Sequence, residues 1–192
     1  MLKSAERVQV ERFYDEVLVA LSPFQIQPPN PHPRLTAPEY VRPRLIAYAL
    51  RSQQLDTILQ KLGAKEFCAL GCERRPEGCC WEYGYRMGNE DFFEFLELQE
   101  VEAGRRGWNA PGKRCWYHSR HGCRLSLFKG PVCLRLLCPA LVRSLGRRYG
   151  HEAMLFSDAL ANLSLDVRRS PSLLAEMDRA IAAGNRLLNG KS

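Results

Sequence analysis

Eight cysteines, confined to the middle of this 192-residue chain, are the residues whose type and spacing could do chemistry. They form two groups of four with 34 residues between them, and the first 67 and last 54 residues contain none. The spacing is C-x3-C-x6-C-C in the first group and C-x7-C-x9-C-x4-C in the second: Cys68, Cys72, Cys79, Cys80, Cys115, Cys123, Cys133 and Cys138. This clustering indicates one local role for the sulfurs, and metal binding is the leading interpretation.

The compartment decides how these cysteines should be interpreted. The N-terminal residues are charged throughout and lack the apolar core of a secretory signal, and no segment approaches the roughly 18 apolar residues of a membrane helix. We therefore expect a cytoplasmic protein with no membrane partner, in which thiols stay reduced and bind metal more often than they form disulfides. All eight cysteines are candidate ligands, although a single four-ligand site would leave four for another role.

The thiolates suit two kinds of metal centre. Four of them can hold a structural zinc ion, with Zn–S distances near ~2.3 Å, or a 4Fe-4S cluster. Cys68 and Cys72 are four residues apart, so on a helical turn both sulfurs lie on one side. Cys138 is followed by Pro139, the step that closes the cysteine run of bacterial ferredoxins. This step favours iron–sulfur somewhat over zinc, and the choice stays open.

A basic block surrounds the second cysteine group. Residues 104–150 contain eleven Lys and Arg and no acid, whereas 89–102 contain six acids and no base. We interpret the basic block as charge compensation, because cations lower thiol pKa values and offset the negative charge of a thiolate centre. The cations close to the second-group cysteines in sequence are Arg114, Arg120, Arg124, Lys129 and Arg135. The alternative is a zinc-stabilised nucleic-acid-binding module, in which these cations contact phosphates and interleaved aromatic residues stack on bases.

Two histidines lie inside the second group, in the pattern C-x2-H-x2-H-x-C. Either His118 or His121 could replace a thiolate at zinc. The interpretation that we favour is that both are exposed loop residues. The sequence does not identify a protein partner.

The cysteine pattern resembles that of the YkgJ-type cysteine-cluster family, over about residues 67–139. The resemblance rests on Phe67-Cys68, Cys72, Gly78-Cys79-Cys80, Asn89-Glu90-Asp91 at a helix start, Cys115, Gly122-Cys123, Pro131-Val132-Cys133 and Cys138. That family is described as a zinc- or iron-chelating domain with eight cysteines, so the resemblance implies metal chelation without a defined reaction. The first group is wider here than the family's usual spacing, which is close to C-x2-C-x2-C-C.

An enzymatic role is a further alternative. A related cysteine pattern occurs in flagellin lysine-N-methylases, which carry an iron–sulfur cluster, and this motivates a cluster-dependent enzyme of methyl transfer or redox chemistry. The chain has no G-x-G-x-x-G, no P-loop, no H-E-x-x-H and no C-x3-C-x2-C run. The sequence itself therefore names no reaction.

The elements that must position the cysteines are predicted to be mainly α-helical. Apolar residues at helical spacing predict helices over 4–21, 39–62, 90–103, 139–148, 151–167 and 171–188. Seven of the twelve prolines fall in 22–43, which we expect to be an extended connector. We expect one compact domain: N-terminal helices in 1–66, the cysteine-cluster metal-binding region in 67–139 and C-terminal helices in 140–192. The predicted fold class is thus mainly α, a helical domain around an irregular cysteine-rich centre.

Helical periodicity also predicts which residues the core contains. For 39–62 the expected inward face is Tyr40, Leu45, Ile46, Ala49, Leu50, Leu55, Ile58 and Leu59. For 151–167 it is Met154, Leu155, Ala159, Leu160 and Leu163. Gly63 and Gly150 are expected to end helices, and Ser170-Pro171 to begin the last one.

Overall fold

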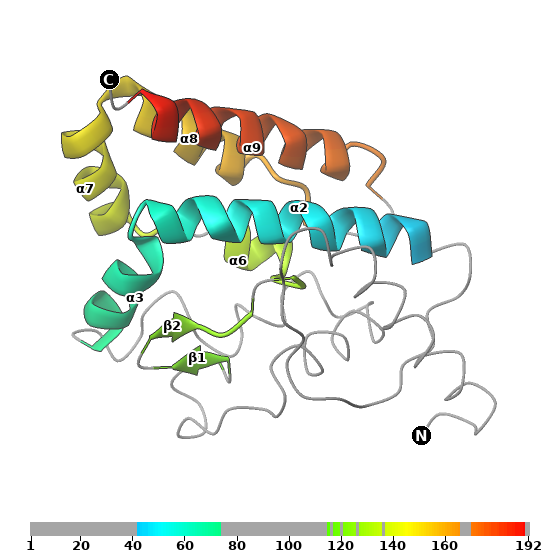
Figure 1. Cartoon of the computed structure of the whole chain (residues 1–192), viewed down its shortest axis with the longest axis horizontal. Coiled ribbons are helices and arrows are strands. Elements are labelled where there is room, and N and C mark those ends of the chain that lie inside the picture. Colours follow the sequence, from blue (N-terminus) through cyan, green and yellow to red (C-terminus); the bar gives the residue numbers. More distant parts are fainter. Residues whose placement is uncertain are drawn as a thin grey trace.

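The computed structural model describes residues 42–73, 115, 117–119, 121–125, 127–135, 137–165 and 170–190 (Figure 1). These residues form six helices and one two-stranded antiparallel ribbon, so the mainly α prediction is confirmed for them. The helices are α2 (Arg42–Lys61), α3 (Ala64–Glu73), α6 (Pro131–Arg135), α7 (Pro139–Tyr149), α8 (His151–Ala161) and α9 (Leu173–Asn189). The strands are β1 (His118–Ser119) and β2 (Gly122–Cys123). The predicted helices over 4–21 and 90–103, and all but the last two residues of the 22–43 connector, lie outside the described residues.

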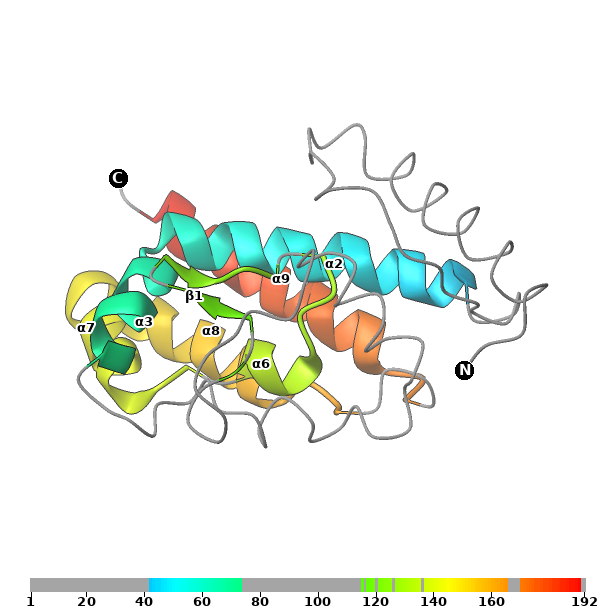
Figure 2. The ribbon, with the colours of Figure 1, turned by 90° about the horizontal axis from the view of Figure 1, so that it is seen from below.

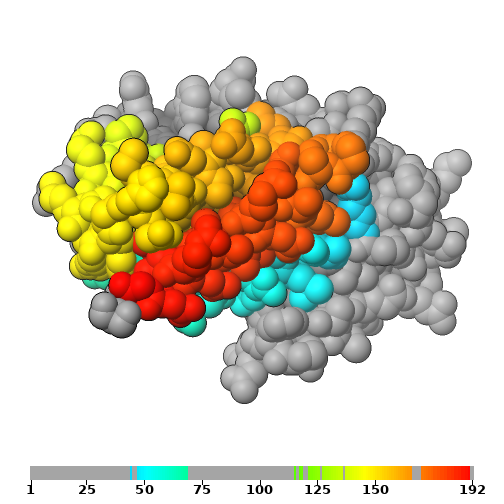
Figure 3. Space-filling view, turned by 90° about the horizontal axis from the view of Figure 1, so that it is seen from above, coloured from blue at the N-terminus to red at the C-terminus, as the bar shows by residue number. Residues whose placement is uncertain are grey.

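Four helices form the frame of the described structure. Helix α2 packs along α9, α9 packs against α8, and α8 packs against α7 (Figures 1 and 2). Helices α7, α8 and α9 lie side by side on the face shown in Figure 3, with α2 beneath the edge of α9. The core between them includes Tyr48, Leu55, Ile58, Leu127, Phe128, Phe156, Leu160, Met177, Ala180 and Leu187. None of the described helices has both the length and the apolar composition of a membrane-spanning segment.

Polar contacts fix the position of α9 against its neighbours. The guanidinium of Arg51 in α2 donates from Nε and Nη2 to the two carboxylate oxygens of Asp178, at 2.9 and 2.8 Å. The backbone N–H of Ser164, just after α8, donates to Glu176 Oε2 at 2.6 Å. Because Asp178 and Glu176 both belong to the first half of α9, these bonds hold that half in register with α2 and α8.

Gly184 lets α9 approach both α2 and α8. A Cβ built at this residue would lie 2.7 Å from Ile58 Cγ2 and 2.9 Å from Phe156 Cε2. Both neighbours are buried: Ile58 is 4% exposed and Phe156 is 0% exposed. The three helices therefore meet at a point where the sequence supplies no side chain.

We expect Gly184→Ala to lower the free energy of unfolding, because inserting a methyl group into a packed core costs about 1–3 kcal/mol. The gain in helix propensity, about 0.5–1 kcal/mol, acts in the opposite direction. Gly146→Ala in α7 is the matched control, since a Cβ there would meet nothing within 4 Å, and it should gain about 0.5–1 kcal/mol. Urea denaturation followed by circular dichroism measures both variants. Equal stabilisation by the two would contradict the close packing at Gly184.

Most of the predicted helix ends are confirmed. The helix predicted over 39–62 is α2, and Gly63 after it has a φ of 76°, a conformation that glycine adopts at little cost. The helix predicted over 139–148 is α7, which begins at Pro139 and is followed by Gly150 with a φ of 60°. The last helix begins at Leu173 with Ser172 as its N-cap residue, so the prediction that Ser170-Pro171 begins this helix was wrong by two residues.

The prediction for α8 was wrong in two respects. The helix ends at Ala161 rather than at 167: the N–H of Leu163 donates to the Leu160 carbonyl, three residues back, and the Asn162 side-chain amide also donates to the Asp158 carbonyl, so the i→i−4 pattern stops there. The predicted inward residues Met154 and Leu155 are 57% and 37% exposed. The buried residues of α8 are Ala153, Phe156 and Leu160. Apolar residues occur on nearly every side of this helix, so periodicity did not identify the inward face.

Two helices were not predicted as elements. Helix α3 begins directly after Gly63 and carries Cys68 and Cys72. Helix α6 is a short helix of five residues around Cys133. Both helices are short, and a segment of so few residues does not show enough of an apolar repeat to be recognised as a helix from its sequence.

Candidate metal centre

The structure describes six of the eight predicted ligands to different extents. Cys79 and Cys80 lie outside the described residues, and for Cys72 only its backbone place in α3 is described. Cys68 lies in α3, Cys123 in β2 and Cys133 in α6, Cys115 precedes the ribbon, and Cys138 is the N-cap residue of α7. The second cysteine group is thus distributed over the ribbon and the starts of two helices.

The β1–β2 ribbon brings Cys123 beside His118. These two residues are directly paired in the register, so their side chains lie on the same face of the ribbon. His118 is 5% exposed, which contradicts its interpretation as an exposed loop residue, whereas His121 at the turn is exposed as expected. His118 is buried because it belongs to a strand of the ribbon, while His121 lies between the strands.

A small apolar cluster, separate from the main core, forms around the ribbon. Cys115, Tyr117 and Leu125 are buried together, and Cys123 packs against them. The backbone N–H of His118 donates to the Cys115 carbonyl at 3.0 Å, which closes the turn before β1. Two cysteines of the second group therefore share one cluster.

Cys138 and Cys68 have a different environment. The N–H of Leu141 donates to Cys138 Sγ at 3.3 Å, so this sulfur caps the first turn of α7. Both Cys68 and Cys138 pack against the main hydrophobic core. Their sulfurs take part in the packing of the helical frame.

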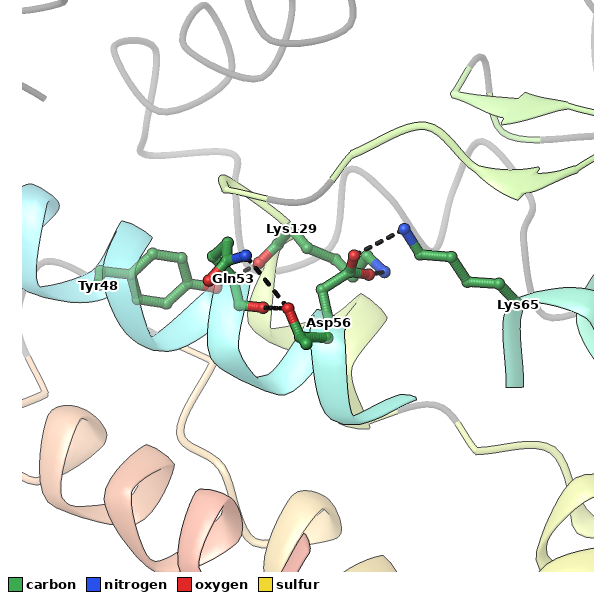
Figure 4. A network of polar contacts seen from close by, with 6 residues as sticks. Tyr48, Gln53, Asp56, Lys65 and Lys129 are labelled. Carbon is green, nitrogen blue, oxygen red and sulfur yellow. Dashed lines mark hydrogen bonds and ion pairs between the residues drawn. The ribbon is translucent and has the colours of Figure 1, made fainter. Parts of the chain in front are cut away.

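A buried group of charges lies next to the ribbon and α6 (Figure 4). Asp56 in α2 binds two ammonium groups: Lys65 Nζ lies 2.6 Å from Asp56 Oδ2, and Lys129 Nζ contacts Oδ1. The side chain of Asp56 is 4% exposed, that of Lys129 7% and that of Lys65 22%. Lysine and aspartate are almost never buried unless they are paired, and here one carboxylate serves two lysines.

Lys129 is held at both ends by α2. Its ammonium contacts Asp56, and its backbone carbonyl accepts a hydrogen bond from the Tyr48 hydroxyl. Tyr48 and Asp56 are eight residues apart on one helix, so α2 fixes Lys129 along two of its turns.

On the same helix, Thr57 Oγ1 donates to the Gln53 carbonyl at 2.9 Å and accepts from Gln53 Nε2 at 3.1 Å.

The electrostatics of this group connect it to the cysteines. Burial alone would lower the pKa of the Lys129 ammonium. The negative charges of Cys123 and Asp56, the hydrogen bond to Asp56 and the negative charge of Cys133 outweigh burial, so this pKa is raised. Burial and, after it, the charge of Cys133 raise the pKa of the Tyr48 hydroxyl. Lys129 therefore stays charged at neutral pH, and the stability from its charge is lost only as the pH rises through the raised value.

The basic block divides into two parts where it is described. Lys129 is buried and bound to Asp56, so it is inaccessible to phosphate groups. The arginines of α7 and Arg124 are exposed: Arg124, Arg143, Arg147 and Arg148. Arg135, two residues after Cys133, is half-buried, and Lys129 is the buried cation of the block among the described residues.

Sequence reasoning missed Tyr48, Asp56 and Lys65. A signal was present, because Tyr48, Ser52 and Asp56 follow one another at intervals of four and therefore lie on one side of a helix. All three are at most 3% exposed. Three polar residues on the inward side of a helix indicate a buried polar partner. A search for helical spacing that considers apolar residues alone does not detect them.

The described residues contain no group of three or more histidine, cysteine, aspartate or glutamate side chains placed to hold a metal ion. The eight-cysteine ligand set therefore stays a prediction, and its Cys79-Cys80 pair lies outside the described residues. No family model, no curated protein and no solved structure matches this chain. The resemblance to the YkgJ-type family likewise stays a prediction.

Proposed function

We propose that this protein binds a metal centre, an iron–sulfur cluster or zinc, through cysteine thiolates of both groups. One observation supports this function above the others. The ribbon places Cys123 next to α3, where Gly122 meets the Lys65 carbonyl, and Cys133 lies in the first turn of α6, four residues after the buried Lys129. Cysteine thiolates are the ligands that structural zinc and iron–sulfur clusters use.

The charge of the surroundings fits such a centre. A site with four thiolates carries a formal charge of about −2 with either zinc or an oxidised 4Fe-4S cluster. Lys65 and Lys129 provide two positive charges, and Asp56 provides one negative charge. The group therefore has one positive charge in excess, which is opposite to the negative charge of a buried thiolate centre. Bound metal would supply cross-linking of the ribbon to the helices, or electron transfer if it is iron–sulfur.

The function is tested by measuring the metal content of protein purified without oxygen. We expect either a brown protein with iron, sulfide and broad absorbance near ~400 nm, or a colourless protein with about one or two zinc ions per chain. The first result would direct attention to redox or cluster-dependent chemistry. The second would indicate a structural centre.

Replacing two cysteines tests whether the thiolates are responsible. Cys123→Ser combined with Cys133→Ser should lose the bound metal, because a hydroxyl is a poor substitute for a thiolate ligand. His121→Ala is the matched control: His121 lies in the same ribbon turn but is exposed, so its metal content should equal that of the wild type. Wild-type protein that contains no metal and takes up neither Zn²⁺ nor Co²⁺ would refute the proposed function.

A further inference from the structure

The buried lysine pair poses a problem of charge balance. Asp56 is the carboxylate that Lys65 and Lys129 share in the described part of the chain, so the group carries one positive charge in excess. Taking an ion out of water costs several kcal/mol even after relaxation, unless another charge repays it. Lys65 is partly exposed and keeps some contact with water, but the Lys129 side chain is 7% exposed. An additional anion beside Lys129 would therefore lower the electrostatic energy of the group.

The backbone geometry brings two cysteines to this position. At Gly122 the ribbon touches α3 directly: a Cβ there would lie 2.8 Å from the Lys65 carbonyl oxygen. Cys123 is the next residue, so it lies close to the helix that carries one of the two ammonium groups. Gly122 has a φ of 90°, which a residue with a side chain rarely adopts, so both its conformation and its neighbour require glycine.

Cys133 reaches the same position from the other direction. Lys129 lies two residues before α6, and the N–H of Leu134 donates to the Gly130 carbonyl at 3.1 Å, which forms the first turn of that helix. Cys133 lies within this turn, so a single helical turn links it to Lys129. Because α2 anchors Lys129 at both its carbonyl and its ammonium, the ammonium cannot move away from the two cysteines without breaking those bonds.

We propose that Cys123 and Cys133 are ligands of one anionic metal–thiolate site and that Lys129, held by Asp56, is its fixed countercharge. This inference rests on the proposed function and assigns positions within it. Lys129 is a positioning residue that does not itself bind the metal. Cys138 is distinguished from these two cysteines by its place at the N-cap of α7.

A fixed ammonium should raise the affinity of the site for a thiophilic cation. It lowers the electrostatic cost of gathering several metal-bound thiolates at one place. Groups that act on a metal through its ligands typically contribute 10–100-fold in affinity. Removing the charge of Lys129 should therefore weaken metal binding without removing a ligand.

The experiment is a titration of the full-length, metal-free protein with Zn²⁺ in competition with a chromophoric chelator. Lys129→Met should bind Zn²⁺ about 10–100-fold more weakly than the wild type. Lys129→Arg keeps the positive charge and should recover most of the affinity. Lys65→Met is the matched control, because Lys65 binds the same carboxylate from a more exposed position, and it should lose less affinity than Lys129→Met. Co²⁺ titration of each variant should give the same thiolate-to-cobalt absorption intensity at saturation, since no ligand is removed.

The outcomes separate the two proposals. If the wild type binds neither Zn²⁺ nor Co²⁺ and contains no iron, the proposed function itself is wrong. If the wild type binds metal and Lys129→Met binds it equally well, only the countercharge is wrong. If Lys129→Met does not fold, Asp56→Asn combined with Lys129→Met removes both buried charges and is measured in its place, again against Lys65→Met. An affinity of this double variant equal to that of the wild type would overturn the inference.

Discussion

Asp56→Asn should be among the most destabilising single substitutions in the described part of the chain, with a loss of about 3–5 kcal/mol in the free energy of unfolding. The amide has nearly the shape of the carboxylate but no charge, so two ammonium groups, one of them buried, lose their counter-ion. Breaking a buried ion pair by removing one partner typically costs this much, because the remaining charge stays uncompensated. Urea denaturation at neutral pH, with every variant in the same metal-bound state, measures the loss.

An exposed ion pair provides the control for this substitution. Asp178 is bound by Arg51 with both oxygens, but its side chain is 55% exposed, and exposed pairs contribute about 0–1 kcal/mol. Asp178→Asn should therefore cost far less than Asp56→Asn. If the two losses were equal, the burial of Asp56 would not carry the energetic weight that we assign to it.

A double replacement separates the charge from the packing at the same position. Asp56→Leu combined with Lys129→Met removes both charges and keeps apolar volume, and such replacements of buried pairs are often neutral or stabilising. The Tyr48 bond survives because it is made to the backbone carbonyl of Lys129. We expect the double variant to be more stable than Asp56→Asn alone. A double variant as unstable as the single one would mean that shape, and not charge, holds this part of the protein.

The sequence predicted the long helices because their signals are local. Pro139 and Gly150 mark the ends of α7 through backbone restrictions that act within one or two residues. Ala49, Leu55, Ile58 and Leu59, predicted to face inward in α2, are buried, and the polar Ser52 and Asp56 are buried with them. Where such signals are strong, neighbouring elements are not needed to interpret them.

The buried charges could not be predicted in the same way. Asp56 and Lys129 are 73 residues apart, and only the folded chain brings them together. Within the sequence, Lys129 was one of eleven cations in the basic block, and nothing local distinguishes a buried lysine from an exposed arginine. Charge compensation by the whole block stays a prediction: the α7 arginines are exposed, and the fold identifies Lys129 as the buried cation of the block among the described residues.

The inward face of α8 leads to the second large effect, the replacement of Phe156. This ring is fully buried, and its Cε2 would lie 2.9 Å from a Cβ at Gly184. Phe156→Ala should lower the free energy of unfolding by about 3–5 kcal/mol, since it removes the transfer energy of the ring and leaves a cavity between two helices. Phe156→Leu, which fills part of that cavity, should lose less.

Met154→Ala is the control on the same helix, two residues away. Met154 is 57% exposed, and surface substitutions of this kind usually change stability by less than about 0.5 kcal/mol. The inward face that periodicity predicted for α8 contains Met154, and it would make Met154→Ala the more destabilising of the two substitutions. Thermal and urea denaturation of Phe156→Ala and Met154→Ala therefore determine the rotation of α8 about its own axis. A larger loss for Met154→Ala would mean that α8 packs with the face that periodicity suggested, and that α9 does not meet it at Gly184.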